Sequence, residues 1–176
     1  MSSRAVRGPS QAITRLFLAS GAALAAAAAW LVVVDRPRPA GFAAAGSGLS
    51  LLVGGHRANH GAGGPADRML DALLDRVWDG AVLGSIAWAM RDESPHIAVA
   101  ALVALGASFL SSYVRARGAA LGYTVEESHV TRGLRYALVS FGLATDGLGW
   151  ALWSSAALSV AAALVRSVQV AKEERL

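Results

Sequence analysis

The chain has 176 residues, of which 55% are hydrophobic and 16% charged, with a mean hydropathy of +0.46 and no cysteine. Soluble domains carry about a quarter charged residues, so this composition indicates a membrane protein. The lack of cysteine excludes disulfides, thiolate metal sites and cysteine nucleophiles. The net charge of +4 would suggest nucleic-acid binding in a soluble domain. The placement of the charges argues against a nucleic-acid partner here.

The first uncharged run, 16–34, predicts a membrane-spanning helix. Its nineteen residues would extend about 28 Å as a helix, close to the thickness of the hydrocarbon core. Arg4 and Arg7 precede it as they would in a signal peptide, but the run continues through Trp30 into a charged turn without a convincing cleavage site. We therefore expect this helix to be retained in the protein.

Five further spans are predicted, near 39–55, 69–90, 97–114, 132–148 and 149–166. The fold class is thus all-α, a single membrane domain over 1–176 with about six transmembrane helices. With the N-terminus in the cytoplasm, twelve basic residues lie on the cytoplasmic side and only Arg36, Arg38 and Arg91 lie outside, apart from Arg76 within the third helix. Basic loops favour the cytoplasm, so we predict a multi-pass cell-membrane protein with both termini inside.

The third span carries the most informative pattern in the chain, four aspartates at intervals of four residues: Asp67, Asp71, Asp75 and Asp79. On a helix they form one acidic face, which we call the aspartate stripe. A carboxylate inside a membrane-spanning helix costs at least about 2.5–3.5 kcal/mol. Two interpretations remain open. The stripe is either a solvated helix end paired with Arg68 and Arg76, or a carboxylate cage for Mg²⁺ or Mn²⁺.

This segment resembles a known family. Leu70-Asp71-x-x-x-Asp75-Arg76-x-x-Asp79-Gly80-Ala81-Val82 is similar to the second half of the CDP-alcohol phosphatidyltransferase signature, with the closest likeness to actinobacterial phosphatidylinositol phosphate and phosphatidylglycerophosphate synthases. Ser111-Ser-Tyr-Val-Arg-Ala-Arg117 and Thr131-Arg132-Gly-Leu-Arg135 resemble the stretch with which those enzymes hold the acceptor phosphate. The resemblance covers about 55–170 and also implies six helices.

The resemblance implies a specific chemistry in phospholipid biosynthesis. A phosphatidyl group would move from a CDP-diacylglycerol-type lipid to a polar, phosphorylated alcohol, releasing CMP. Asp71 and Asp75 would bind Mg²⁺ or Mn²⁺, and Asp75 would also be the catalytic base. Because two carboxylates make a poor two-metal site, we hypothesise that either Asp67 or Asp79 supplies a further ligand or activity is lost. A homodimer in membrane lipid, with its active site facing the cytoplasm, is expected.

The resemblance also implies a substrate-binding set. Arg57 matches the signature arginine, and the residues that would hold the acceptor phosphate are Arg117, Arg132 and Arg135, with Ser112 and Tyr113 as hydrogen-bonding neighbours. A guanidinium group suits this role because it donates two parallel hydrogen bonds to a phosphate. The residues alone leave a second interpretation open, in which these arginines only reflect the excess of positive charge at the cytoplasmic side.

The first half of the signature is different in this chain. Leu49 and Leu52 stand where the family has its first two aspartates, and Asp67 stands where it has glycine. A second register, Gly63-x-x-x-Asp67-x-x-x-Asp71, also fits the spacing, but it loses the Asp-Arg-x-x-Asp-Gly context. Two alternatives to an enzyme follow: a degenerate, non-catalytic lipid-binding or partner protein, and an ion-coupled transporter. The transporter would need carboxylates at mid-membrane and an inverted repeat, and no repeat is evident.

Overall fold

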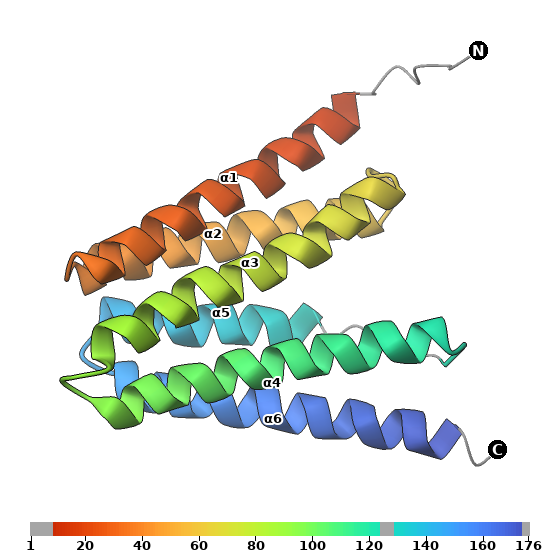
Figure 1. Cartoon of the computed structure of the whole chain (residues 1–176). Coiled ribbons are helices and arrows are strands. Elements are labelled where there is room, and N and C mark those ends of the chain that lie inside the picture. The colour runs from red at the N-terminus through yellow and green to blue at the C-terminus, as the bar shows by residue number, and fades with distance from the viewer. Residues whose placement is uncertain (1–8, 124–128, 174–176) are drawn as a thin grey trace.

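The computed structural model describes residues 9–123 and 129–173, which form six α-helices and no strand. The helices are α1 (Pro9–Val33), α2 (Pro37–Asn59), α3 (Pro65–Met90), α4 (Pro95–Ala120), α5 (His129–Ala144) and α6 (Leu148–Glu173) (Figure 1). The all-α fold and the six helices are therefore confirmed. Most of the helices extend beyond the uncharged runs, because their polar end turns are also helical.

Proline and glycine set several helix boundaries. Pro37, Pro65 and Pro95 each stand in the first turn of a helix, where a missing N–H costs nothing. Gly61 and Gly122 follow the ends of α2 and α4 with φ values of +92° and +90°. Glycine adopts this left-handed conformation without strain, so the chain turns sharply there.

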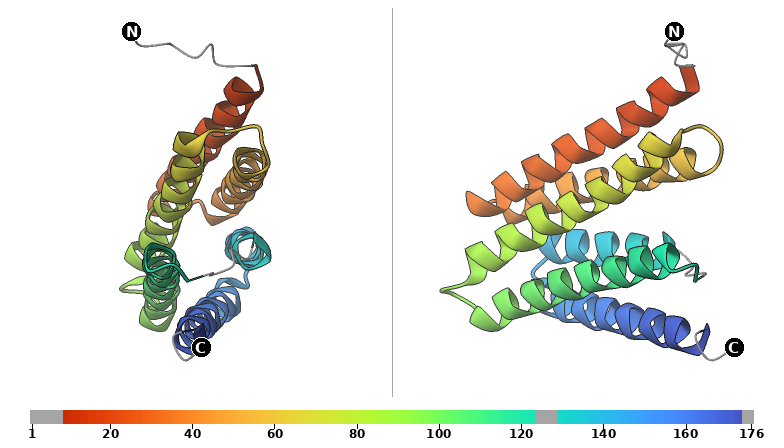
Figure 2. Two further views of the ribbon diagram at one scale, coloured as in Figure 1. Left: turned by 90° about the vertical axis from the view of Figure 1, so that its right-hand side faces the viewer. Right: turned by 45° about the vertical axis from the view of Figure 1, so that its right-hand side comes forward.

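The helices are arranged as a ring with one helix outside it. Going round the ring, α2 packs against α3, α3 against α4, α4 against α6, α6 against α5, and α5 against α2. α1 packs on the outside of α2 and α3, and α1 begins at the same end of the bundle at which α6 ends (Figures 1 and 2). α3 and α5 thus face one another across the interior of the ring.

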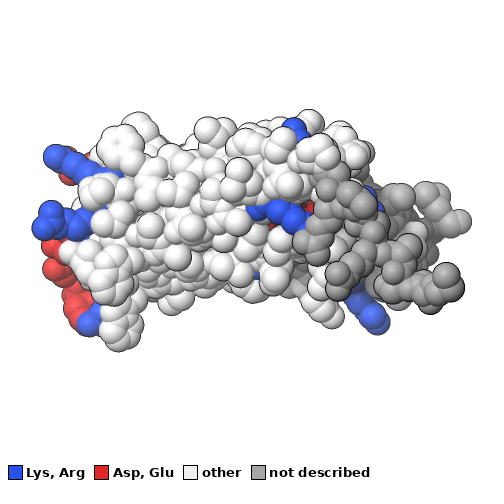
Figure 3. Space-filling model, turned by 90° about the horizontal axis from the view of Figure 1, so that it is seen from above, with Lys and Arg blue, Asp and Glu red and all other residues white. Residues whose placement is uncertain are grey.

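On the face seen in Figure 3, charged side chains gather at one end, and a broad uncharged stretch lies next to them. Large apolar side chains such as Leu16, Phe42 and Leu102 are exposed. Within the described residues, α1, α4 and α6 are long and apolar enough to cross a membrane. This is a membrane protein. α5 has 16 residues and extends only about 24 Å, so crossing by all six helices stays a prediction, as does a single domain over 1–176.

α2 and α5 approach closely at Gly41. A Cβ atom added there would lie 2.6 Å from the backbone N of Ala144 and 2.7 Å from the carbonyl O of Ser140. Such contacts are shorter than real Cβ atoms make, and backbone atoms cannot rotate away. Small residues at helix contacts are common in membrane bundles, where they allow this close approach. Gly106 of α4 is a matched contrast, because a Cβ there would meet nothing within 4 Å.

We expect Gly41→Ala to lower the free energy of unfolding by about 1–3 kcal/mol, because α2 and α5 must separate. Gly106→Ala should leave it unchanged or raise it by up to about 1 kcal/mol, since alanine is the better helix former. SDS titration of the purified variants in mixed micelles measures both values. Equal stability of the two variants would contradict the close contact between α2 and α5.

Candidate functional site

The aspartate stripe lies inside the bundle. Each of its four aspartates is at most 8% exposed, and Asp79 is completely buried. The stripe is therefore not a solvated helix end. Since buried carboxylates need charged or hydrogen-bonding partners, the partners of each aspartate define what the stripe does.

Asp67 stands apart from the other three and joins α3 to α1. Its carboxylate accepts a hydrogen bond from Arg15 Nε at 2.6 Å and another from the backbone N–H of Gly64 at 2.9 Å. The second bond caps the first turn of α3, where backbone N–H groups lack helical partners. Asp67 thus has a structural position at the start of the helix.

Asp71 is held by α5. Arg132 donates to it with both terminal nitrogens, at 2.6 and 3.2 Å, which is the two-pronged geometry that guanidinium and carboxylate groups prefer. From α2, the Asn59 amide donates at 3.4 Å. Gly55 of α2 lies directly against the same carboxylate, and a side chain at that position would collide with it.

Asp75 contacts four side chains, from Tyr136, Arg132, Arg135 and Arg76. Tyr136 donates its hydroxyl proton at 2.6 Å, and Arg135 and Arg132 lie 3.0 and 3.1 Å from the same oxygen. Arg76 pairs with the other oxygen. Three guanidinium groups therefore surround this one carboxylate.

Asp79 completes the set at the far end of the site. Arg135 Nε lies 2.8 Å from its first oxygen and Arg76 lies 3.1 Å from its second. The Ser108 hydroxyl of α4 also donates to Asp79. Asp79 therefore connects α3 with both α4 and α5.

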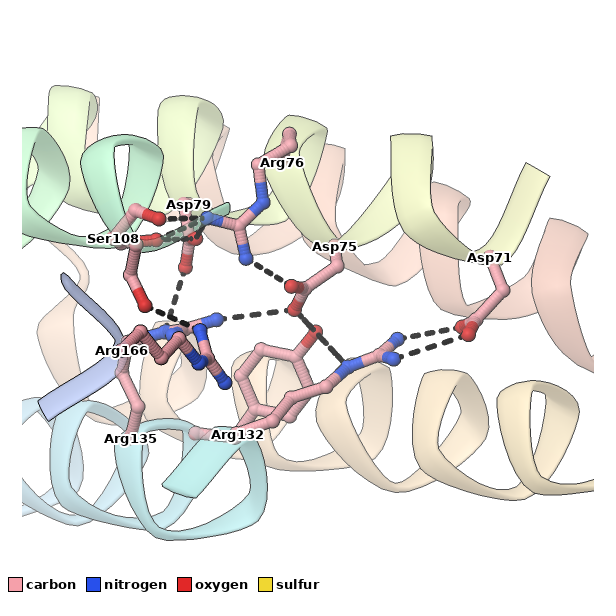
Figure 4. A network of polar contacts seen from close by, with 10 residues as sticks. Asp71, Asp75, Arg76, Asp79, Ser108, Arg132, Arg135 and Arg166 are labelled. Carbon is pink, nitrogen blue, oxygen red and sulfur yellow. Dashed lines mark hydrogen bonds and ion pairs between the residues drawn. The ribbon is translucent and has the colours of Figure 1, made fainter. Parts of the chain in front are cut away.

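These contacts form a ladder of ion pairs between three aspartates and three arginines (Figure 4). Arg132 bridges Asp71 and Asp75, while Arg135 and Arg76 each bridge Asp75 and Asp79. The three negative charges of the aspartates balance the three positive charges of the arginines. We call this group the Asp–Arg ladder: Asp71, Asp75, Asp79, Arg76, Arg132 and Arg135.

A polar cavity lies beside the ladder, where α3, α4, α5 and α6 meet. Its lining residues are Asp75, Arg76, Ser108, Ser111, Ser112, Arg115, Thr131, Arg132, Arg135, Ser159, Ala162 and Arg166. Five of these residues are arginines, and three of the five pair with the aspartates of the Asp–Arg ladder. Guanidinium, hydroxyl and low exposure together favour an anion with several oxygen atoms, such as a phosphate group.

The cavity contains only part of the predicted substrate-binding set. Ser112, Arg132 and Arg135 line it. Tyr113 and Arg117 instead line a separate groove between the ends of α4 and α6, and Tyr113 is 65% exposed. Arg57 donates to Ser10 at the start of α1, at 3.4 Å to its hydroxyl.

Several residues of the site had no assigned role in the sequence. Tyr136 follows Arg135 directly and lies one turn after Arg132, a spacing that places it on the same face of α5. Arg115 belongs to the 111–117 stretch that resembles the family's acceptor-phosphate region, although it was not among the predicted binding residues, and Arg166 was interpreted only as a topology signal. Arg166 hydrogen-bonds to Ser111, and both line the cavity. No sequence pattern identifies Ser108 as a residue of the site, since serines are frequent in membrane helices.

The side chains do not fit a divalent ion. Carboxylate oxygens are the ligands that Mg²⁺ and Mn²⁺ prefer, but every carboxylate of the ladder is already bound by arginine. α2 supplies none, since 36–66 contains no Asp or Glu. Leu49 is 65% exposed and Leu52 packs near Gly133 of α5. Across residues 9–123 and 129–173, no three His, Asp or Glu side chains converge as a metal site.

We expect Asp79→Ala to lower the free energy of unfolding by about 3–5 kcal/mol, because it leaves the buried Arg135 and the partly buried Arg76 without one of their partners. Asp92→Ala is the matched control. Its side chain is 76% exposed and pairs with Arg91 at 3.0 Å on the surface, so its loss should not be measurable. SDS titration of both variants tests this, and an Asp79→Ala variant as stable as the control would contradict the ladder.

No family model matches the chain. Among curated proteins, the phosphatidylinositol phosphate synthase of Corynebacterium glutamicum is 38% identical over 112 residues, which cover 58% of this chain and 51% of that protein. The corresponding synthase of Mycolicibacterium smegmatis is 32% identical over 127 residues, or 66% of this chain and 57% of that protein. The chain thus spans about half the length of the curated relatives it matches.

A solved structure with the same fold is phosphatidylinositol phosphate synthase of Mycobacterium tuberculosis with CDP-DAG bound. It has a TM-score of 0.73 and 24% identity, with 90% of this chain and 84% of that chain covered. The same enzyme in complex with manganese and citrate also gives a TM-score of 0.73 at 24% identity, covering 90% and 80%. The resemblance to CDP-alcohol phosphatidyltransferases is therefore confirmed: the chain is homologous to phosphatidylinositol phosphate synthases and shares their fold.

Proposed function

We propose that the protein is a membrane phosphotransferase that moves a phosphatidyl group from a CDP-linked lipid to a polar, phosphorylated alcohol in phospholipid biosynthesis. The observation that carries this proposal is the cationic cavity next to Asp75. Five arginines line it, and Asp75 is its single carboxylate among the described residues. The homologous synthases and the CDP-DAG complex of one of them support the same reaction class.

The chemistry follows from these groups. The hydroxyl oxygen of the alcohol would attack the β-phosphorus of the CDP-lipid, forming a new P–O bond while the bond to the bridging oxygen of the pyrophosphate breaks. CMP leaves with that electron pair. Asp75 would accept the hydroxyl proton, and Arg132 and Arg135 would stabilise the negative charge on the transferring phosphoryl group.

A lipid substrate is supported by a second groove that adjoins the cavity. It lies along α6, with Thr131 of α5 at its edge, and shares Thr131, Ala162 and Arg166 with the cavity. Leu158 and Val165 make its remaining wall largely apolar. A phosphate held in the cavity would therefore have an apolar path beside it for an acyl chain.

Three further parts of the proposal come from the resemblance. Mg²⁺ or Mn²⁺ is the implied cofactor, and a relative's structure holds manganese, but no step here is assigned to a metal because the side chains do not fit one. We also propose a homodimer. An active site facing the cytoplasm is supported by the twelve basic residues assigned to that side.

A second candidate is a non-catalytic protein that binds the same lipid. It is favoured by Leu49 and Leu52, which replace the first two aspartates of the family signature. It is also favoured by the three guanidinium groups around Asp75, because a carboxylate so strongly paired is a weak base.

We expect purified protein in lipid nanodiscs to release CMP from CDP-diacylglycerol when glycerol 3-phosphate or inositol phosphate is added, with Mg²⁺ and Mn²⁺ present. Asp75→Asn should reduce this release at least about 100-fold, the usual loss when a general base is removed. Asp92→Asn, an exposed change far from the cavity, is the matched control and should keep full activity.

The outcome separates the two candidates. Acceptor-dependent CMP release that is lost only in Asp75→Asn supports the transferase. No release with any CDP-lipid or acceptor, from protein that remains folded, would refute the transferase and leave the lipid-binding candidate.

A further inference from the structure

Two residues of the predicted substrate-binding set, Tyr113 and Arg117, line a groove between the ends of α4 and α6, which we call the α4–α6 groove. The groove has a volume of about 260 Å³ and shares no lining residue with the polar cavity beside the ladder. Tyr113 and Arg117 therefore have surroundings of their own, apart from the acceptor site that the resemblance implies. The other lining residues are Val114, Gly118, Leu121 and Ser167.

The lining of the groove combines one positive charge with apolar surface. Arg117 is its only charged residue among the described residues, and it is exposed. None of the ion pairs between described residues involves Arg117. Tyr113 and Leu121 stand one helical turn before and after Arg117, and they are 65% and 57% exposed. A ligand that fits this face carries a negative charge next to an apolar part.

Four exposed tryptophans indicate where one boundary of the membrane lies. They stand in the last turns of α1 and α3 and the first two turns of α6, which meet at the same end of the bundle (Figure 1). Exposed tryptophan is enriched at the membrane–water interface, so this end lies at one membrane surface. The four residues are Trp30, Trp88, Trp150 and Trp153.

The α4–α6 groove lies at the opposite boundary of the membrane. α4 begins with Pro95 at the tryptophan end and rises about 33 Å to Arg117 and about 27 Å to Tyr113. The hydrocarbon core of a bilayer is about 30 Å thick. Arg117 therefore lies at the level of the lipid headgroups of the second leaflet, and Tyr113 lies at the edge of its acyl chains.

We propose that the α4–α6 groove binds one anionic phospholipid of the surrounding bilayer, whose phosphate pairs with Arg117 while an acyl chain packs against Tyr113 and Val114. Basic pockets between membrane helices bind anionic headgroups through such contacts. A free phosphate compound would leave the apolar wall uncovered. A zwitterionic lipid carries an ammonium group that competes with Arg117 for its own phosphate. The site is separate from the proposed transferase chemistry and does not depend on it.

Native mass spectrometry tests the proposal on the full chain, released from detergent micelles that contain equal amounts of phosphatidylglycerol and phosphatidylcholine. We expect the unchanged protein to retain phosphatidylglycerol as its first bound lipid with a preference of about fivefold, the effect of one arginine near a membrane surface. Arg117→Gln should lower the preference below twofold, and Arg117→Lys should keep it. Arg38→Gln is the matched control, because it removes an equally exposed arginine at the tryptophan end.

A large excess of glycerol 3-phosphate distinguishes a lipid from a free phosphate compound, and it should not displace the bound lipid. Four results would overturn the proposal: equal retention of the two lipids, a preference that survives Arg117→Gln, an equal loss in Arg38→Gln, or displacement by glycerol 3-phosphate. The unfolding midpoints of the variants check that they fold. CMP release is not part of this measurement, so failure of the lipid site and failure of the transferase are distinct outcomes.

Discussion

The pairing of buried aspartates on α3 with arginines on α5 is the constraint on which the rest of the structure depends. α5 packs against α2 and α6, and it reaches α3 across the ring through Arg132 and Arg135. A buried charge without its partner is strongly destabilising. The ring is therefore held closed by a few ion pairs in its interior as well as by close packing at contacts such as Gly41.

The same pairs determine the chemistry of the site. Because each ladder arginine is fixed by two carboxylates, its remaining N–H groups point in defined directions and the cavity beside Asp75 is organised before any ligand binds. Organised donors of this kind cost no rearrangement during binding or reaction. The carboxylates that fix the arginines are no longer available to a divalent ion. One set of contacts thus favours an oxyanion and disfavours metal coordination.

The sequence predicted the helices well because hydrophobic runs and proline-initiated helices are local features. It also predicted that the acidic residues share one face of α3. It left open whether this face met solvent or the interior, since a four-residue spacing fits both. The partners were harder to predict: Asp71 and Arg132 are separated by 61 residues in the chain. Packing of α5 against α2 and α6, which no local pattern encodes, brings them together.

The candidate site was only partly predictable for a related reason. Ser112 and Tyr113 are neighbours in the chain, yet about 100° of helical rotation separates their side chains, so one lines the cavity and the other is exposed. Ser159 is one of several serines in α6 and is distinguished only by where the helix packs. Arginines near helix ends have two roles that sequence cannot separate: they set topology, and they bind anions.

The central claim is that the aspartates of α3 and the arginines of α5 are direct partners in the interior of the bundle. A double-mutant cycle on Asp71 and Arg132 tests it most directly, with SDS titration of Asp71→Ala, Arg132→Ala and the double variant. We expect each single variant to lose about 3–5 kcal/mol, because a buried charge is left without its partner, and the double variant to lose clearly less than the sum of the two. Additive losses would contradict the direct pairing.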